Sequence, residues 1–255
     1  MTDKDARLNV SADSSQYVPQ HTGWAEPGSR FVSGLQPLRV AILVDGGFYL
    51  RQSRVHIGKL SAPEQANSLL RYCAEHIPPG FRLYRIFYYD CPPSSKKAFH
   101  PLLAKTVDLS KTASCEWHRQ FHNELRITDH VAVRMGELLD SQSEYILKKK
   151  SARELFTRKR NLDSLTLEDF VLDITQKGVD MRIGLDIATL AHKKLVDRIV
   201  LIGGDSDIVP AAKHARREGL EFVLDPMGHP ITSSLREHID VLEDLSDKLT
   251  PDLKF

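Results

Sequence analysis

Short apolar runs that stop at an acidic residue recur along this chain. The runs 41–44, 82–89 and 199–202 are followed by Asp45, Asp90 and the segment Gly203–Asp207. An apolar run of this length, bounded by turn residues, is typical of a parallel strand that is buried on both faces. Each run therefore predicts a strand that delivers an acid to the carboxyl edge of a sheet.

Helical periodicity fills most of the chain between these runs. Apolar residues at helical spacing predict a helix over 62–77, and similar patterns predict helices over 96–110, 117–125, 179–194, 208–218 and 234–245. Further strands are expected over 127–135 and 221–224. In the helix 179–194, the residues expected to pack are Met181, Leu185, Ala188, Leu190 and Ala191. Alternating strands and helices predict an α/β fold with three layers, α/β/α, around a mainly parallel, Rossmann-like sheet.

Composition divides the chain into three parts. Residues 1–37 are rich in Ser, Gly, Pro and Gln without periodicity, which predicts a flexible N-terminal tail. The domain is expected to cover residues 38–245, and residues 246–255 to form a C-terminal tail. Within the domain, residues 140–166 have the composition of a basic insertion. Its positive charges, set against Glu154, are Lys148, Lys149, Lys150, Arg153, Arg158, Lys159 and Arg160.

Overall composition is that of a soluble globular protein. The 255 residues are 41% hydrophobic and 27% charged, with a formal net charge of only +1, so contact with nucleic acid would require a local basic patch. Three cysteines without paired spacing suit a reducing compartment, and no apolar segment reaches the length of a membrane helix. We therefore expect a cytoplasmic protein with no membrane partner.

The acids at the strand ends suggest metal chemistry. Ligands of open α/β sheets bind at the carboxyl edge, where Asp45, Asp205 and Asp207 are predicted to meet. Carboxylates gathered at one place repel one another, so a divalent cation is their natural partner. Asp207 alone could be a helix N-cap, but a cap does not require Asp205 as well. The pattern predicts a metal-dependent enzyme that acts on a phosphate-containing substrate.

Two further acids, Asp180 and Asp186, are alternative members of this site. Six residues of helix turn through about 600°, so the two side chains should face different ways. Asp180 falls at the predicted helix start, where an acid is favoured in any case. Asp186 falls inside the helix among apolar neighbours, where an acid is costly unless it is paired or bound to metal. The sequence therefore favours Asp186 over Asp180 as a metal ligand.

Three motifs together resemble the LabA-like branch of the NYN-domain family. They are Val44–Gly47, Lys177–Asp180 with Asp186, and Gly204–Pro210. The resemblance covers roughly residues 38–230 and implies a PIN-like nuclease fold. It also implies a metal-dependent ribonuclease that hydrolyses RNA phosphodiester bonds with Mg²⁺ or Mn²⁺. The implied catalytic residues are Asp45, Asp186, Asp205 and Asp207, and the implied metal ligands are the same four with Asp180.

One departure from the family pattern leaves an alternative function open. Many members carry Asn three positions after the first Asp, and Phe48 stands there in this chain. The alternative is a catalytically weak or inactive NYN module that binds RNA or a protein partner. A phosphatase with Asp45 as nucleophile is disfavoured, because Gly47 stands where a second acid is expected.

The basic insertion is the expected contact with RNA. Near an acidic site, clustered Lys and Arg side chains can hold phosphates and give salt-dependent affinity. A homo-oligomer is also compatible with the sequence. The residues predicted to bind RNA are Lys148, Lys149, Lys150, Arg158, Lys159 and Arg160.

Overall fold

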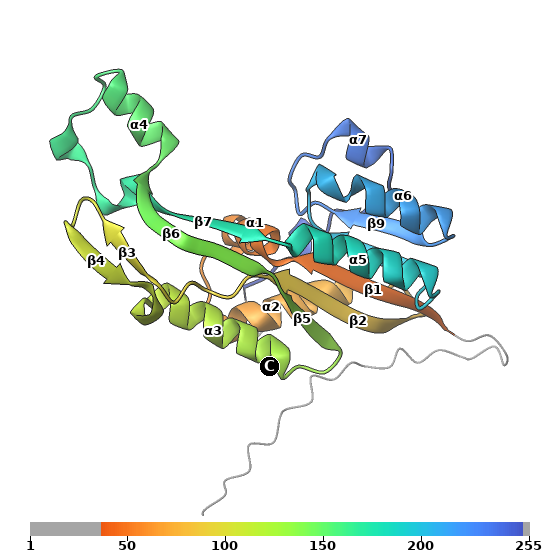
Figure 1. Cartoon of the computed structure of the whole chain (residues 1–255). Coiled ribbons are helices and arrows are strands. Elements are labelled where there is room, and N and C mark those ends of the chain that lie inside the picture. Colours follow the sequence, from red (N-terminus) through yellow and green to blue (C-terminus); the bar gives the residue numbers. More distant parts are fainter. Residues whose placement is uncertain (1–36, 252–255) are drawn as a thin grey trace, which may run out of the picture. The chain divides into compact units, whose positions relative to one another are not determined.

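A parallel sheet of six strands forms the centre of the domain. The computed structural model describes residues 37–251, apart from the side chains of residues 140–143, so the predicted N-terminal tail lies outside the described residues except for residue 37. The strand order is β10–β9–β8–β1–β2–β5, with every pair parallel (Figure 1). These strands are β1 (Leu38–Asp45), β2 (Phe81–Asp90), β5 (Val131–Met135), β8 (Arg198–Ile202), β9 (Glu221–Asp225) and β10 (Val241–Leu242).

Helices cover both faces of this sheet. One face packs against α5 (Val179–His192) and α6 (Val209–Arg217), and its core includes Leu43 and Leu201. The other face carries α1 (Gly46–Ile57), α2 (Ala62–Glu75) and α3 (Ala113–Arg126) (Figure 1). There Tyr88 of β2 packs edge-on against Phe121 of α3, with ring centroids 5.5 Å apart. The predicted three-layer α/β/α fold with a parallel sheet is confirmed.

The order of the strands reverses between β1 and β8. From β1 the chain moves outward through β2 to β5, and after α5 it returns to β8 beside β1 and continues to β9 and β10. Val44 of β1 pairs with Ile202 of β8, so the residues that follow each strand leave the sheet side by side. The connections then diverge to opposite faces, which opens a crevice at the carboxyl edge.

A long antiparallel pair extends from this sheet and carries the basic segment. β6 (Glu137–Leu147) pairs with β7 (Phe170–Lys177), and we call residues 137–177 the arm (Figure 1). The tip holds α4 (Lys149–Phe156) and two short 3₁₀ helices, Leu162–Ser164 and Leu167–Asp169. The base is supported by the hairpin of β3 (Lys97–His100) and β4 (Lys105–Asp108).

Two of the predicted helices are wrong. Residues 96–110 form β3, β4 and a 3₁₀ helix, Leu109–Lys111, because Ala98 and His100 face inward with the two-residue period of a strand. The predicted helix 234–245 is reduced to α7 (Ser233–Arg236). Asp240 then exchanges backbone and side-chain hydrogen bonds with Phe222, which draws the next residues into β10 beside β9.

The other differences concern packing and the end of the domain. Met181 and Leu185 are 71% and 60% exposed, and Ile183 and Ile187 face the core instead. Leu249 is buried, so the packed domain extends past the predicted boundary at residue 245. As predicted, Gly219 ends α6, with a φ of 88° that favours glycine. None of the helices described between residues 37 and 251 is both long and apolar enough to cross a membrane.

Candidate metal centre

Four aspartates from three chain segments line one small cavity at the crevice between β1 and β8. They are Asp45, Asp180, Asp205 and Asp207. The floor is apolar and includes Ile183, Leu201 and Ile208. The volume is about 20 Å³, which is room for one water-sized ligand. No basic side chain is among the lining residues, so the negative charges are balanced from elsewhere.

Asp45 is held in place by the helix that follows it. It is the N-cap of α1, and its Oδ1 accepts a hydrogen bond from the Phe48 amide at 3.1 Å. Burial raises the pKa of Asp45, the Phe48 hydrogen bond lowers it, and the charges of Asp180 and Asp90 raise it further. The helix begins at Gly46 with no intervening turn, and only glycine fits there, since a Cβ would lie 2.5 Å from the Tyr88 hydroxyl.

Asp205 and Asp207 belong to the turn that follows β8. Asp205 caps the 3₁₀ helix Ser206–Ile208, and its Oδ1 accepts a hydrogen bond from the Asp207 amide at 3.0 Å. Capping therefore explains Asp205, contrary to the sequence argument, and Asp207 is the acid that no cap requires. Both side chains are exposed. The turn lies close to α1, because a Cβ on Gly204 would be 2.9 Å from the Phe48 ring.

Asp180 completes the set from the first turn of α5. Although the side chain is largely exposed, loss of hydration at the cavity raises its pKa, and the charges of Asp205 and Asp207 raise it further. A carboxylate that served only the positive end of a helix would show the opposite shift. The electrostatic position of Asp180 is therefore that of a member of the acidic cluster.

Asp186 lies outside this cavity. It is six residues further along α5 and accepts hydrogen bonds from the Tyr89 hydroxyl at 2.8 Å and from Arg134 Nε at 3.2 Å. These two partners explain how an acid is tolerated among apolar neighbours. As predicted, Asp180 and Asp186 face different ways, but the structure places Asp180 on the cavity, where the sequence favoured Asp186.

A buried polar cluster behind Asp45 escaped the sequence argument. Asp90, at the end of β2, accepts hydrogen bonds from the Tyr88 hydroxyl at 3.3 Å and from the Cys91 amide at 2.7 Å, and contacts His122 Nε2 at 2.9 Å. The sequence placed Asp90 at a strand end, but nothing in its spacing indicated the partner on α3. This cluster lies within the electrostatic reach of Asp45, because Asp90 contributes to its raised pKa.

The donor set fits a divalent cation. Among residues 37–251, no three Asp, Glu, His or Cys side chains already stand close enough together to hold one ion. Four carboxylates around a water-sized cavity nevertheless supply the hard oxygen ligands that Mg²⁺ and Mn²⁺ prefer. The raised pKa values of Asp45 and Asp180 show that the carboxylates repel one another, and a cation would relieve that repulsion.

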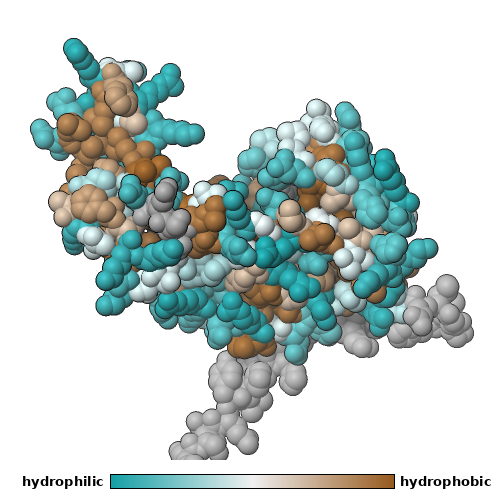
Figure 2. Space-filling view, in the orientation of Figure 1, coloured by the Kyte–Doolittle hydropathy of each residue, from teal (hydrophilic) through white to brown (hydrophobic). Residues whose placement is uncertain are grey.

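The predicted RNA-binding residues lie together at the tip of the arm. Five of them are exposed and surround α4, namely Lys148, Lys149, Lys150, Arg158 and Lys159. Apolar side chains are exposed beside them, with Phe156 and Leu162 at 90% and 72%, and Figure 2 shows teal and brown surface intermixed over this end of the arm. A surface of cations and exposed aromatic or aliphatic groups suits single-stranded nucleic acid.

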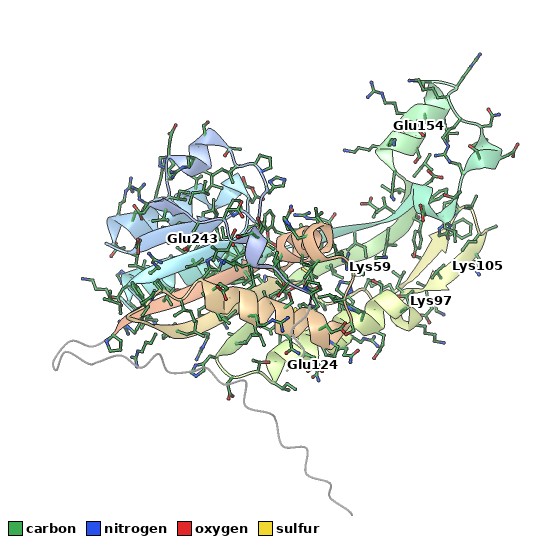
Figure 3. All side chains as sticks on the ribbon, turned by 180° about the vertical axis from the view of Figure 1, so that it is seen from behind. Lys59, Lys97, Lys105, Glu124, Glu154 and Glu243 are labelled. Atoms are coloured by element: carbon green, nitrogen blue, oxygen red, sulfur yellow. The ribbon has the colours of Figure 1, made fainter. Side chains whose placement is uncertain are left out.

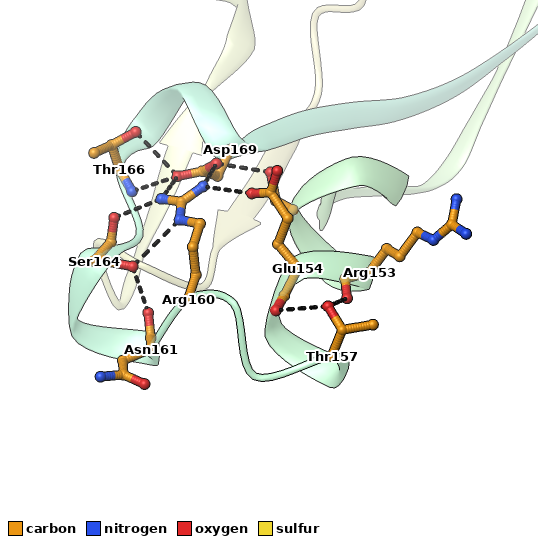
Figure 4. Close-up of polar contacts among 9 residues, drawn as sticks. Arg153, Glu154, Thr157, Arg160, Asn161, Ser164, Thr166 and Asp169 are labelled. Carbon is orange, nitrogen blue, oxygen red and sulfur yellow. Dashed lines mark hydrogen bonds and ion pairs between the residues drawn. The ribbon is translucent and has the colours of Figure 1, made fainter.

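Arg160 has a structural role that separates it from the other five. Its guanidinium forms a bidentate pair with Asp169, at 2.7 and 2.9 Å, and also reaches Glu154 at 3.5 Å (Figure 4). Asp169 accepts further hydrogen bonds from Ser151 and Thr166. The Arg160 hydrogen bonds hold the pKa of Asp169 well below its usual range. This network joins α4 to the start of β7 and so fixes the shape of the tip.

Comparisons with known proteins give a family. The NYN domain matches residues 39–242, which is most of the chain. No curated protein matches. Among solved structures, the chain is similar to a protein of unknown function from Vibrio parahaemolyticus, with 17% identity and a TM-score of 0.46, over 84% of this chain and 99% of that one. On the match over residues 39–242, the chain belongs to the NYN domain family, whose members have the PIN-like nuclease fold.

Proposed function

We propose that this protein is a metal-dependent ribonuclease of the LabA-like branch, which hydrolyses RNA phosphodiester bonds at the crevice between β1 and β8. The observation that carries the proposal is the meeting of Asp45, Asp180, Asp205 and Asp207 around one water-sized cavity. These four residues would hold Mg²⁺ or Mn²⁺. When bound, such an ion lowers the pKa of a water ligand and offsets negative charge on the phosphoryl oxygens.

The four carboxylates have different tasks in this proposal. Asp45 is buried and capped through Oδ1, so it gives the site a fixed reference point. Asp205 and Asp207 are exposed on a short turn, so their side chains can rotate toward an ion or a substrate phosphate. Asp180 has a raised pKa, so its carboxylate is the stronger base and is suited to accept a proton from the attacking water. Asp186 is left out, because Tyr89 and Arg134 already engage it.

Phe48 supports the alternative of a weak or inactive RNA-binding module. Its ring is buried against Gly204, in the position where the family pattern has an amide. An amide from another strand nevertheless stands close by. A Cβ on Gly47 would lie 3.7 Å from Gln176 Oε1 and 3.6 Å from Asp45 Oδ1. Gln176 of β7 can therefore supply a polar group at this edge, which favours an active site.

The deciding experiment is cleavage of end-labelled single-stranded RNA with Mg²⁺, Mn²⁺ or EDTA. We expect cleavage with either metal and none with EDTA. Asp205→Asn keeps the side-chain shape and the cap but loses a charged ligand, so its rate should fall at least about a hundredfold. Asp129→Asn removes an exposed acid that precedes β5 at the opposite edge of the sheet, and should cleave as the wild type does. Equal rates in wild type and Asp205→Asn would exclude this mechanism.

A further inference from the structure

A second cavity lies between the end of α1 and the start of α3, away from the four aspartates. Its volume is about 350 Å³, which is within the usual range for pockets that hold small molecules. We call it the Trp117 pocket, and the lining residues that matter here are Arg54, Lys59, Gln65, Ser114, Trp117 and His118. Figure 3 shows Lys59 on the flank of the domain from which β3 and β4 project, with Lys97 and Lys105 further out.

The charged groups of this pocket are all bases. Arg54 and Lys59 are exposed, and no acid is among the lining residues. His118 Nδ1 donates to the Ser114 carbonyl at 2.7 Å, which leaves Nε2 for a ligand. The first turn of α3, a helix of 14 residues, adds the partial positive charge of its amide groups. A pocket with this charge selects an anion.

An aromatic wall and a buried amide make the pocket more than an anion site. Trp117 is fixed by a hydrogen bond from Nε1 to the Leu60 carbonyl at 2.9 Å and by stacking on Phe121. The guanidinium of Arg54 approaches the Trp117 ring, with 5.9 Å from Cζ to the centroid. A planar group can therefore stack on Trp117 and receive Arg54 from above or beside it.

Gln65 supplies the polar contact inside the pocket. The side chain is 1% exposed and donates its two amide hydrogens to Tyr49 Oη at 3.0 Å and Ser53 Oγ at 3.3 Å. Those bonds fix the orientation of the amide and leave its carbonyl oxygen to accept a hydrogen bond at the pocket wall. A ligand that combines an anion, a flat ring and a ring N–H donor matches these groups together.

We propose that the Trp117 pocket binds one unpaired nucleotide of an RNA chain outside the acidic site. The phosphate is held by Arg54 and Lys59, and the base stacks on Trp117 near the Gln65 carbonyl. The identification of the ligand as part of an RNA substrate rests on the proposed ribonuclease function. The pocket itself is a property of α1 and α3 and does not depend on the four aspartates.

Tryptophan fluorescence tests the pocket without any cleavage. The chain has two tryptophans, Trp24 and Trp117, so Trp24→Phe leaves Trp117 as the only reporter. In EDTA and at low salt, adenosine 5′-monophosphate should change the fluorescence saturably, while adenosine and inorganic phosphate alone should bind more weakly. In the same background, Arg54→Gln with Lys59→Gln should weaken nucleotide binding at least about tenfold, because two charge-assisted contacts are lost.

A matched control removes the same charge elsewhere. Arg82→Gln with Lys193→Gln changes two exposed cations that do not line the pocket, and should bind the nucleotide normally. The proposal is overturned if the nucleotide gives no saturable change at millimolar concentrations, if adenosine binds as tightly as its phosphate, or if both double variants lose affinity equally. Nucleotide binding without RNA cleavage would support the pocket and remove the ribonuclease, and cleavage without nucleotide binding would remove the pocket alone.

Discussion

The replacement Asp45→Asn tests the acidic site through stability, with no need for a substrate. Asn is as good an N-cap as Asp, so the hydrogen bond from the Phe48 amide is kept. The variant removes a carboxylate whose pKa is raised in the folded protein by burial and by Asp180 and Asp90. Without metal, its melting temperature at neutral pH should therefore equal or exceed that of the wild type.

The sign of the pH dependence follows from the same shift. A carboxyl whose folded pKa is raised contributes stability that is fully present below its unfolded pKa, near 4, and is lost as the pH rises through the folded value. In EDTA, the wild type should therefore lose stability relative to Asp45→Asn as the pH increases from about 4 toward neutrality.

A bound cation reverses the order of the two proteins. An ion at a hundred times its Kd stabilises the folded state by about 2.7 kcal/mol. For a domain of about 200 residues this corresponds to a rise in Tm of about 5 to 11 °C. If loss of one charged oxygen weakens binding tenfold, the same ion concentration gives Asp45→Asn only about 1.4 kcal/mol, which is half the shift.

Thermal melts of wild type, Asp45→Asn and the control Asp129→Asn, in EDTA, Mg²⁺ and Mn²⁺ at constant ionic strength, measure these shifts. The control should behave as the wild type. An equal metal-induced shift in wild type and Asp45→Asn would place the ion elsewhere and refute the site as described. A lower Tm for Asp45→Asn in EDTA would refute the argument that neighbouring acids destabilise the Asp45 anion.

Three further predictions concern the arm and α5. Replacing the five exposed cations of the tip with Gln should weaken RNA binding and flatten the dependence of log K on log salt by up to about 0.7 per phosphate contact, whereas an unchanged slope would assign them to solvent. Asp169→Asn should speed proteolysis within residues 148–169 and leave the central sheet intact, and because the folded pKa of Asp169 is lowered, the wild-type arm should loosen as the pH falls below about 4. Equal proteolysis of the two proteins would mean that the Arg160 network does not hold the tip. Asp186→Asn should keep the full metal-induced Tm shift, and loss of that shift would return Asp186 to the site.

The strand-end pattern identified the crevice but could not distinguish open acids from sealed ones. Asp45, Asp90 and Asp225 all end parallel strands of the same sheet. Asp45 reaches the cavity, while Asp90 is covered by His122 of α3. Asp225 is fully buried and is held by the Tyr72 hydroxyl and by His76 Nε2 at 2.8 Å, both on α2. The difference depends on which helix packs over each strand end, and that information lies far away in sequence.

The same limit explains the exchange of Asp180 for Asp186. Helical periodicity correctly placed both residues on one helix and on different faces of it. The side of α5 that faces the sheet is set by Ile183 and Ile187, whose packing partners come from strands that are distant in the chain. The sequence gave no measure of that rotation, so it could not say which acid would meet Asp205 and Asp207.

By itself, the sequence determined the layered α/β fold, the central position of β1 and β8, and the edge at which the acids gather. It could do so because apolar runs and helical spacing are local signals, and parallel strands bring their carboxyl ends to one edge. The tertiary structure alone decided the β3–β4 hairpin, β10, the Arg160–Asp169 network and the Trp117 pocket. Each of these depends on contacts between segments that local pattern does not connect, because side-chain burial is decided by the neighbours that the fold supplies.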